Sequence, residues 1–190
     1  MASHWKHSVD AHKQSTESAI AEAAWSLAQQ RGPLAVSMSN VAAAAGVSRP
    51  TVYKYFSDVE SMLIAQHRRH VAEHLAELDA IAAGTGEPTE RLAAVLKAYG
   101  EICHARAHHG DHDIDRLVHT GFEVTAAERE VAQLLTRIIG QGADAGGARN
   151  DVTPAVLAAY CVRALAAAAD VPRTAVAGLV DVVRSSLEPD

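Results

Sequence analysis

Aromatic residues are scarce in this sequence. Four Tyr, two Phe and two Trp occur in 190 residues, whereas alanine runs such as AAAAG and LAAAAD recur. Sheets draw on aromatic and β-branched side chains, and alanine loses no side-chain entropy in a helix, so this composition favours helices over sheets. We therefore expect an all-α protein.

Cysteines and long apolar runs are also few. Cys103 and Cys161 are far apart in the chain, which suits a reducing compartment better than a disulfide framework. The first residues, MASHWKHSVD, lack the apolar segment of a signal peptide, and no uncharged apolar run reaches about 18 residues. These absences lead us to expect a soluble, cytoplasmic protein.

Basic residues are fewer than acidic ones, and the net charge is -6. Residues 1–57 carry five Lys and Arg against three Asp and Glu, which gives +2, so the rest of the chain carries -8. The total argues against indiscriminate binding to nucleic acid. A local cationic surface near the N-terminus can still bind phosphates.

The N-terminal third divides into an arm and short helices. Residues 1–14 have no apolar period, and we expect a flexible arm there. Apolar residues at helical spacing begin near Ile20, and this helix should end at Gly32. Ser37 is placed to cap a second, short helix, and Gly46 to end it in the left-handed conformation.

The stretch GVSRPTVYKYF, residues 46–56, gathers one Arg, one Lys and two Tyr around a proline. Ser48 can cap a third helix here. Arg49 and Pro50 then occupy its first two positions, where proline costs little because the first N–H groups have no partner within the helix. A helix, a glycine-containing turn and a second short helix form the layout of a helix-turn-helix, whose second helix lies in the major groove of DNA.

The side chains of this third helix suit contact with DNA. Arg49 and Thr51 can reach base edges or phosphates. Lys54 and the hydroxyls of Tyr53 and Tyr55 can donate to phosphate oxygens. The alternative is a helical hairpin whose aromatic residues fill a core and whose two charges are solvated, and spacing alone leaves both interpretations open.

The remaining helices follow from caps and breaks. Ser57 and Glu60 have capping-box spacing and open a fourth helix that runs to the break at GTGEP. Further helices are expected at 88–107, 112–120, 125–140, 153–169 and 172–187, which gives about nine in total.

The segment SMSNVAAAAGVSRPTVYKYFSDVESML, preceded by AIAEAAWSLAQQRG, closely resembles the DNA-binding domain of TetR-family transcriptional regulators. The resemblance covers roughly residues 15–64 and combines a first helix that ends in RG, the turn AAGVS and the helix PTVYKYF. It implies an N-terminal three-helix helix-turn-helix domain over 15–60, after the arm of 1–14, and a helical effector-binding and dimerisation domain over 61–190.

The resemblance also implies which residues contact DNA, on or beside the second and third helices. These are Ser37, Ser39, Ser48, Arg49, Thr51, Tyr53, Lys54 and Tyr55. Two positions depart from the family pattern. Val59 stands where many members carry a Lys that contacts phosphate, and Ala28 stands where an aromatic is usual. Lys6, His12 and Lys13 in the arm are candidates to compensate.

The last two helices, in VTPAVLAAYCVRALAAAAD and VPRTAVAGLVDVVRSSL, are apolar over much of their circumference, so each must be buried on several sides. With the same pair from a second chain they would form a four-helix interface, which suits a symmetric reader of two DNA half-sites. We predict a homodimer, and the alternative is a thick monomeric core. The predicted interface residues are Val156, Tyr160, Val176, Leu179 and Val183.

An effector pocket is expected among the middle helices, because ligand pockets are apolar with a few polar groups. Its candidate residues are His67, Val71, His74, Leu96, Tyr99, Cys103 and Phe122. Each of them also fits an ordinary core position.

Histidine and aspartate are concentrated in HARAHHGDHDIDRLVH, residues 104–119. His104 and His108 share one helical face at i, i+4, and His112 is a third candidate metal ligand, although no defined zinc motif is matched. A metal-responsive regulator is one alternative, and solvated histidines at a helix end are another. The doublet His112-Asp113 also has a faint likeness to HD-type metal phosphohydrolases.

These patterns together predict a homodimeric repressor that binds a palindromic double-stranded DNA operator. A small-molecule effector would release it by favouring a conformation whose recognition helices no longer fit successive major grooves. We expect neither enzymatic activity nor a cofactor.

Overall fold

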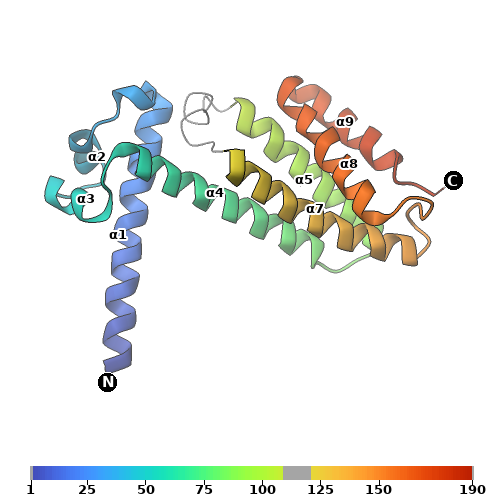
Figure 1. Ribbon diagram of the computed structural model, residues 1–190, viewed down its shortest axis with the longest axis horizontal. Coiled ribbons are helices and arrows are strands. Elements are labelled where there is room, and N and C mark those ends of the chain that lie inside the picture. The colour runs from blue at the N-terminus through green and yellow to red at the C-terminus, as the bar shows by residue number, and fades with distance from the viewer. Residues whose placement is uncertain (1, 109–120, 190) are drawn as a thin grey trace. The chain divides into compact units, whose positions relative to one another are not determined.

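The computed structural model describes residues 2–108 and 121–189, with side chains described for 11–106 and 126–189. Every regular element in this part of the chain is helical, so the all-α prediction is confirmed (Figure 1). The α-helices are α1 (Ala2–Arg31), α2 (Met38–Ala44), α3 (Arg49–Tyr55), α4 (Val59–Ala82), α5 (Pro88–His108), α7 (Gly121–Asp144), α8 (Pro154–Ala166) and α9 (Arg173–Ser185). Two 3-10 helices, η1 (Pro33–Ala35) and η2 (Ala167–Asp170), join them. The helix expected at 112–120 lies outside the described residues.

The chain divides into two compact units, and the division falls within α4, between His70 and Val71. The expected domain boundary after residue 60 lies near the start of the same helix and stays a prediction. Among the described residues, no helix has the length and apolarity needed to cross a membrane.

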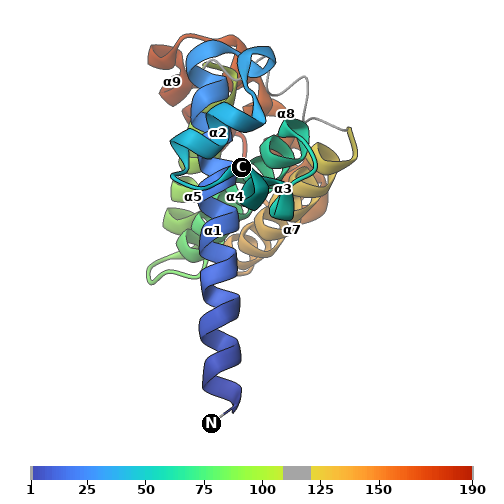
Figure 2. The same ribbon diagram turned by 90° about the vertical axis from the view of Figure 1, so that its left-hand side faces the viewer.

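The first unit packs α2, α3 and the start of α4 against the C-terminal half of α1 (Figure 2). Trp25 and Ile20 supply the largest buried side chains of α1. Val52 is the buried residue of α3, and Phe56, the C-cap residue after it, is also buried. The whole core of this unit consists of Ile20, Ala21, Ala24, Trp25, Ala28, Val41, Ala42, Val52, Phe56, Met62 and Leu63.

The N-terminal end of α1 differs from the flexible arm expected over residues 1–14. The helix begins at Ala2, and among its described side chains, those of residues 11–31, the first buried one is that of Ile20. Residues 2–31 contain no Gly or Pro, so nothing in the sequence stops the helix from extending beyond the part that packs. The absence of an apolar period indicates that no face of the segment is apolar, which is a different property from lacking helical structure.

The second unit is organised around α5, which contacts α7, α8, α9 and η2. Val95 and Leu96 of α5 are fully buried. Gly100 allows α9 to approach closely, because a Cβ atom at this position would come within 2.9 Å of a Val180 methyl group. Arg91 joins three helices: its guanidinium donates to the Ala82 carbonyl at the end of α4 and to Gln141 Oε1 of α7, 3.0 Å away.

Some helix ends differ from the predicted ones. The helix predicted over 125–140 runs from Gly121 to Asp144, and the one predicted over 153–169 is divided into α8 and η2. Asp58, rather than Ser57, caps α4: its Oδ1 accepts from the Ser61 amide at 2.7 Å, while Ser57 donates its hydroxyl to Oδ2 at 2.8 Å. Two adjacent cap-forming residues made this choice ambiguous in the sequence.

Candidate nucleic-acid interface

The turn between α2 and α3 is fixed by backbone hydrogen bonds. Gly46 has φ 67°, the left-handed conformation that the sequence predicted. The Val47 amide donates to the Ala42 carbonyl at 3.0 Å, and the Gly46 amide to the Ala43 carbonyl at 3.3 Å. This pair of bonds is a Schellman motif, which satisfies the last carbonyls of α2 and directs the chain into α3.

The start of α3 is capped by Ser48, as predicted. Its Oγ accepts from the Thr51 amide at 3.2 Å and lies 2.8 Å from the Thr51 hydroxyl. Arg49 and Pro50 are the first two helical residues, so the proline removes no intrahelical hydrogen bond. A helix of only seven residues gains little from propagation, so the cap and the buried Val52 hold it in place.

One side of α3 is left exposed by this packing. Arg49, Tyr53 and Lys54 are exposed, and Val52 and Phe56 are buried against the unit. The Arg49 guanidinium carbon lies 6.0 Å from the centroid of the Tyr53 ring, one helical turn away, which is the range of a cation–π contact. The exposed face of α3 therefore presents two cations, one of them held by an aromatic ring.

The other residues predicted to contact DNA have different surroundings. Ser39 is exposed in α2. Ser37 caps α2 by accepting from the Asn40 amide at 3.3 Å, and the Thr51 hydroxyl is engaged with the Ser48 cap. Tyr55 is half-buried against the first unit's core. Ser37, Ser48 and Thr51 thus have structural roles, which leaves Arg49, Tyr53 and Lys54 as the most accessible donors on α3.

The two departures from the family pattern have packing explanations. Val59 is half-buried against the core of the first unit, and Ala28 is buried in it. Trp25, one turn before Ala28, supplies an aromatic ring on the same helical face. The residue before Val59 is the exposed Asp58, whose pKa is lowered by hydrogen bonds from the Ser61 amide and the Ser57 hydroxyl. A carboxylate, rather than a lysine, therefore stands at the start of α4.

His67, which was predicted as an effector ligand, belongs to the first unit. It is buried and stacks on Trp25 with ring centroids 6.3 Å apart. His70 meets the same indole edge-on at 5.0 Å and lies 2.9 Å from Gln66 Nε2. These rings join α4 to α1 within the unit that carries α3.

The remaining predicted effector residues have different surroundings, and their role in ligand binding stays a prediction. Leu96, Tyr99 and Cys103 belong to the buried core of the second unit, and burial raises the pKa values of Tyr99 and Cys103. Val71 is half-buried, and His74 is exposed. The side chain of Phe122 lies outside the described residues. A run of buried positions on α5 has the same residue types as a pocket lining, so the sequence did not separate them.

The predicted dimer residues fall into two groups. Val176 and Val183 are core positions, because they are 5% and 1% exposed within their own chain. Val156 and Tyr160 are 58% and 43% exposed on α8, and Leu179 is half-buried. Val182 of α9, which the prediction missed, is 65% exposed. Its neighbour Val183 has the same side chain, so only the helix register tells the two apart.

His104, a weak candidate metal ligand in the sequence, has a structural contact. Its ring is buried, and its Nδ1 lies 3.0 Å from the Ala168 carbonyl oxygen. A carbonyl only accepts, so Nδ1 carries the hydrogen of this bond. Among the described residues, no group of three His, Cys, Asp or Glu could hold a metal ion. His112 and the side chain of His108 lie outside the described part, so the metal and phosphohydrolase alternatives stay untested predictions.

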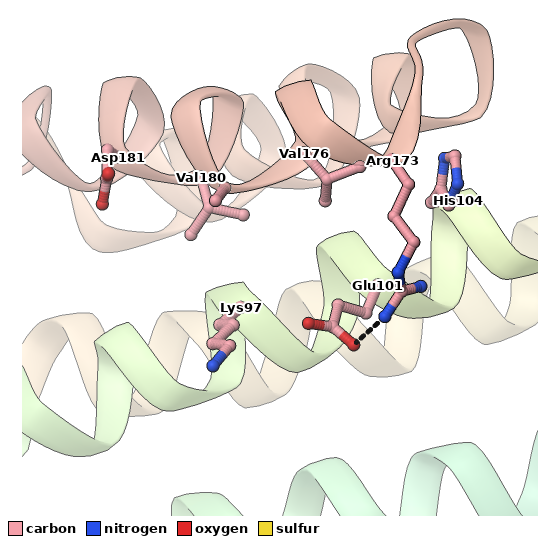
Figure 3. Close-up of a pocket in the computed structure, with 8 residues that line it drawn as sticks. Lys97, Glu101, His104, Arg173, Val176, Val180 and Asp181 are labelled. Carbon is pink, nitrogen blue, oxygen red and sulfur yellow. Dashed lines mark ion pairs between the residues drawn. The ribbon is translucent and has the colours of Figure 1, made fainter.

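A cavity of about 280 Å³ lies in the second unit, between α5 and α9. Lys97, Glu101 and His104 line it from α5, and Arg173, Val176, Ala177, Val180 and Asp181 from α9 (Figure 3). Apart from His104 and Val176, none of these residues was singled out from the sequence. The spacing of Lys97 and Glu101, one helical turn apart, was the available signal.

Comparisons with known proteins bear on the whole fold. The chain is similar to a transcriptional regulator of the TetR/AcrR family from Thermobifida fusca, with 25% identity, a TM-score of 0.76 and coverage of 88% of this chain and 96% of the other. Residues 20–65 match the family model of bacterial regulatory proteins of the tetR family. The N-terminal domain of this chain is therefore of the tetR type, and its α2–α3 hairpin lies within the matched segment.

Other TetR-like relatives match less of the chain or at lower identity. An uncharacterized HTH-type transcriptional regulator of Mycobacterium tuberculosis, present in two strains, is 38% identical over 73 residues, or 38% of this chain. The match spans about a third (36%) of that relative's length. AibR, solved in complex with isovaleryl coenzyme A and operator DNA, has the same fold at 19% identity, with a TM-score of 0.61 and coverage of 91% and 98% of the two chains.

Proposed function

We propose that this chain is a TetR-family transcriptional repressor that binds a palindromic DNA operator as a homodimer and is released by a small molecule. The observation that carries the proposal is the exposed face of α3, with Arg49, Tyr53 and Lys54 on a helix anchored by Val52. A DNA-binding regulator works where the chromosome lies, so we also propose a cytoplasmic location.

The two cations of α3 have different proposed roles. Lys54 is a flexible point charge without an ion pair among the described residues, which suits a phosphate oxygen. Arg49 presents a planar fork of donors that matches the O6 and N7 atoms of guanine, and its contact with Tyr53 orders the fork before DNA arrives. We assign Lys54 to affinity and Arg49 to sequence preference.

Homodimer formation is supported by the apolar side chains left exposed on the last two helices. Val156 and Tyr160 of α8 and Val182 of α9 are each more than two-fifths exposed. A two-fold axis across this face would bring the same apolar side chains of the two protomers together. A dimer of this symmetry would bind an operator whose two half-sites are about 34 Å apart, or a multiple of that distance.

Release would follow from unequal ligand affinity for two conformations of the dimer. A ligand that binds more tightly when the two α3 helices do not match successive grooves lowers operator affinity by that difference. AibR has been solved with both a coenzyme A ester and operator DNA, so its fold, which this chain shares, takes both classes of partner.

The test begins with selection of bound genomic fragments by the purified chain, followed by titration of the best fragment at several salt concentrations. Each phosphate neutralised contributes about 0.9 to the slope of log affinity against log salt. Lys54→Ala should therefore reduce the slope by about 1.8 if two copies bind and by about 0.9 if one does. Arg49→Ala should in addition reduce the difference in affinity between the selected fragment and DNA of random sequence.

Arg137→Ala is the matched control, because Arg137 is an exposed arginine of the second unit that pairs with Asp79 at 2.9 Å. It should bind the operator like the unchanged chain. If both α3 variants also bind with unchanged affinity and salt slope, α3 is not the DNA-reading element and the proposal is wrong.

A further inference from the structure

The cavity between α5 and α9 has an apolar floor and charged ends. Val176 and Val180 are buried, and both lie near Gly100, where an added Cβ would come within 2.9 Å of Val180 and 3.8 Å of Val176. This close packing makes the floor rigid, because neither helix can move inward. Its volume of about 280 Å³ lies at the lower end of the range for small-molecule sites.

Each end of the cavity is lined by one cation and one anion, and α5 and α9 supply them in reversed order. At one end, Glu101 of α5 and Arg173 of α9 form an ion pair at 3.6 Å (Figure 3). At the other end, α5 supplies Lys97 and α9 supplies Asp181, the residue that follows Val180 (Figure 3). The four charges sum to zero, so neither a purely anionic nor a purely cationic ligand matches them.

The two ends differ in how far their charges are already satisfied. Arg173 and Glu101 neutralise each other, and the neighbouring His104 is fixed by its bond to the Ala168 carbonyl. Among the described residues, Lys97 has no ion pair, and the only ion pair of Asp181 is a contact at 4.0 Å with Arg184, which also pairs with Glu188 at 2.9 Å. The end with Lys97 and Asp181 is therefore the one open to a charged ligand.

We propose that this cavity binds a small zwitterion with an aliphatic body, of the class of free aliphatic α-amino acids. The carboxylate of the ligand pairs with Lys97 and its ammonium group with Asp181. The aliphatic body lies on Val180 and Val176, and the Glu101–Arg173 pair closes the far end. Ligand binding at this cavity does not require DNA. Release of DNA by the same ligand rests on the proposed function.

The test uses three probes of nearly equal shape: leucine, 4-methylpentanoate, which lacks the ammonium group, and 3-methylbutylamine, which lacks the carboxylate. Calorimetric titration of the full chain without DNA should show leucine binding at least about tenfold more tightly than either single-charge probe, since a charge-assisted hydrogen bond is worth about that factor. No leucine binding up to about 10 mM, or equal binding of a single-charge probe, overturns the proposal.

Two substitutions locate the site. Lys97→Met should weaken leucine binding about tenfold and leave the affinity for the amine unchanged, whereas Asp181→Asn should weaken both. Both residues are exposed, so the variants should fold, which circular dichroism checks. Arg137→Met and Asp79→Asn, which remove a cation and an anion from the groove between α4 and α7, are the matched controls and should bind leucine normally.

The outcomes separate this inference from the proposed function. If neither Lys97→Met nor Asp181→Asn changes leucine binding, the site lies elsewhere and the inference is wrong. If leucine binds as expected but leaves operator affinity unchanged, the binding site stands and its role as the effector site is overturned.

Discussion

Two glycines allow a test of backbone strain at the turn before the recognition helix. Gly46 has φ 67°, whereas Gly178 is an interior residue of α9 with ordinary helical backbone. A Cβ atom added at either glycine would have no neighbour within 4 Å, so alanine adds no clash at either position. The two substitutions therefore differ only in backbone conformation.

The expected effects have opposite signs. At Gly46, alanine in the left-handed region costs about 1–2 kcal/mol, and the smaller entropy of the unfolded chain returns about 0.4–1 kcal/mol. The net loss for Gly46→Ala is about 1 kcal/mol. Gly178→Ala should gain about 0.5–1 kcal/mol, because only the unfolded-state and helix-propensity effects remain.

Urea denaturation followed by circular dichroism measures both changes in the free energy of unfolding. Gly46→Ala should also weaken operator binding, because relief of the strain changes the direction in which α3 leaves the turn. A Gly46→Ala variant as stable as the unchanged chain, or a shift of the same sign in both variants, would refute this reasoning.

Three further predictions follow from the caps and the helix contacts. Ser48→Ala should cost about 1 kcal/mol of stability in urea denaturation, since the Thr51 amide loses its acceptor; an unchanged midpoint would contradict the cap. Gly100→Ala should destabilise by about 1–3 kcal/mol, because its Cβ would overlap a Val180 methyl group, and the double variant with Val180→Ala should recover part of the loss. The pKa of Asp58 is lower in the folded state than unfolded, so its stabilisation is present above the unfolded pKa and is lost as pH falls through the folded value. Asp58→Asn should therefore show a smaller loss of stability below about pH 4, in denaturation curves measured across that range.

Local rules predicted the helix-turn-helix well. Ser48, Pro50 and Gly46 act within four residues of their own positions, through a cap, a missing N–H and a left-handed turn, so the sequence determines their roles. Arg49 and Lys54 were predicted as exposed because the buried face of α3 is defined by Val52. DNA contact by these residues remains a prediction.

Local rules did not predict which element buries an apolar or aromatic side chain. Val176 has the residue type of a dimer contact, but α5 covers it within its own chain because Gly100 lets the helices approach. His67 has the residue type of a ligand contact but stacks on Trp25, which is more than 40 residues earlier in the chain. Helical periodicity predicts that a face is buried, but it does not predict which element or chain buries it.

The alkylation rate of the two buried thiols reports how often the second unit opens. Cys103 and Cys161 are the only cysteines of the chain, and both lie in this unit. Burial raises the pKa of both thiols, that of Cys161 to about 12, and only thiolates react readily with alkylating reagents. The rate of alkylation at neutral pH therefore depends on how often local unfolding exposes the thiols of α5 and α8. The first unit has no cysteine and does not contribute to this rate. A ligand that binds between α5 and α9 would slow this reaction in proportion to its occupancy, without any probe attached to the protein.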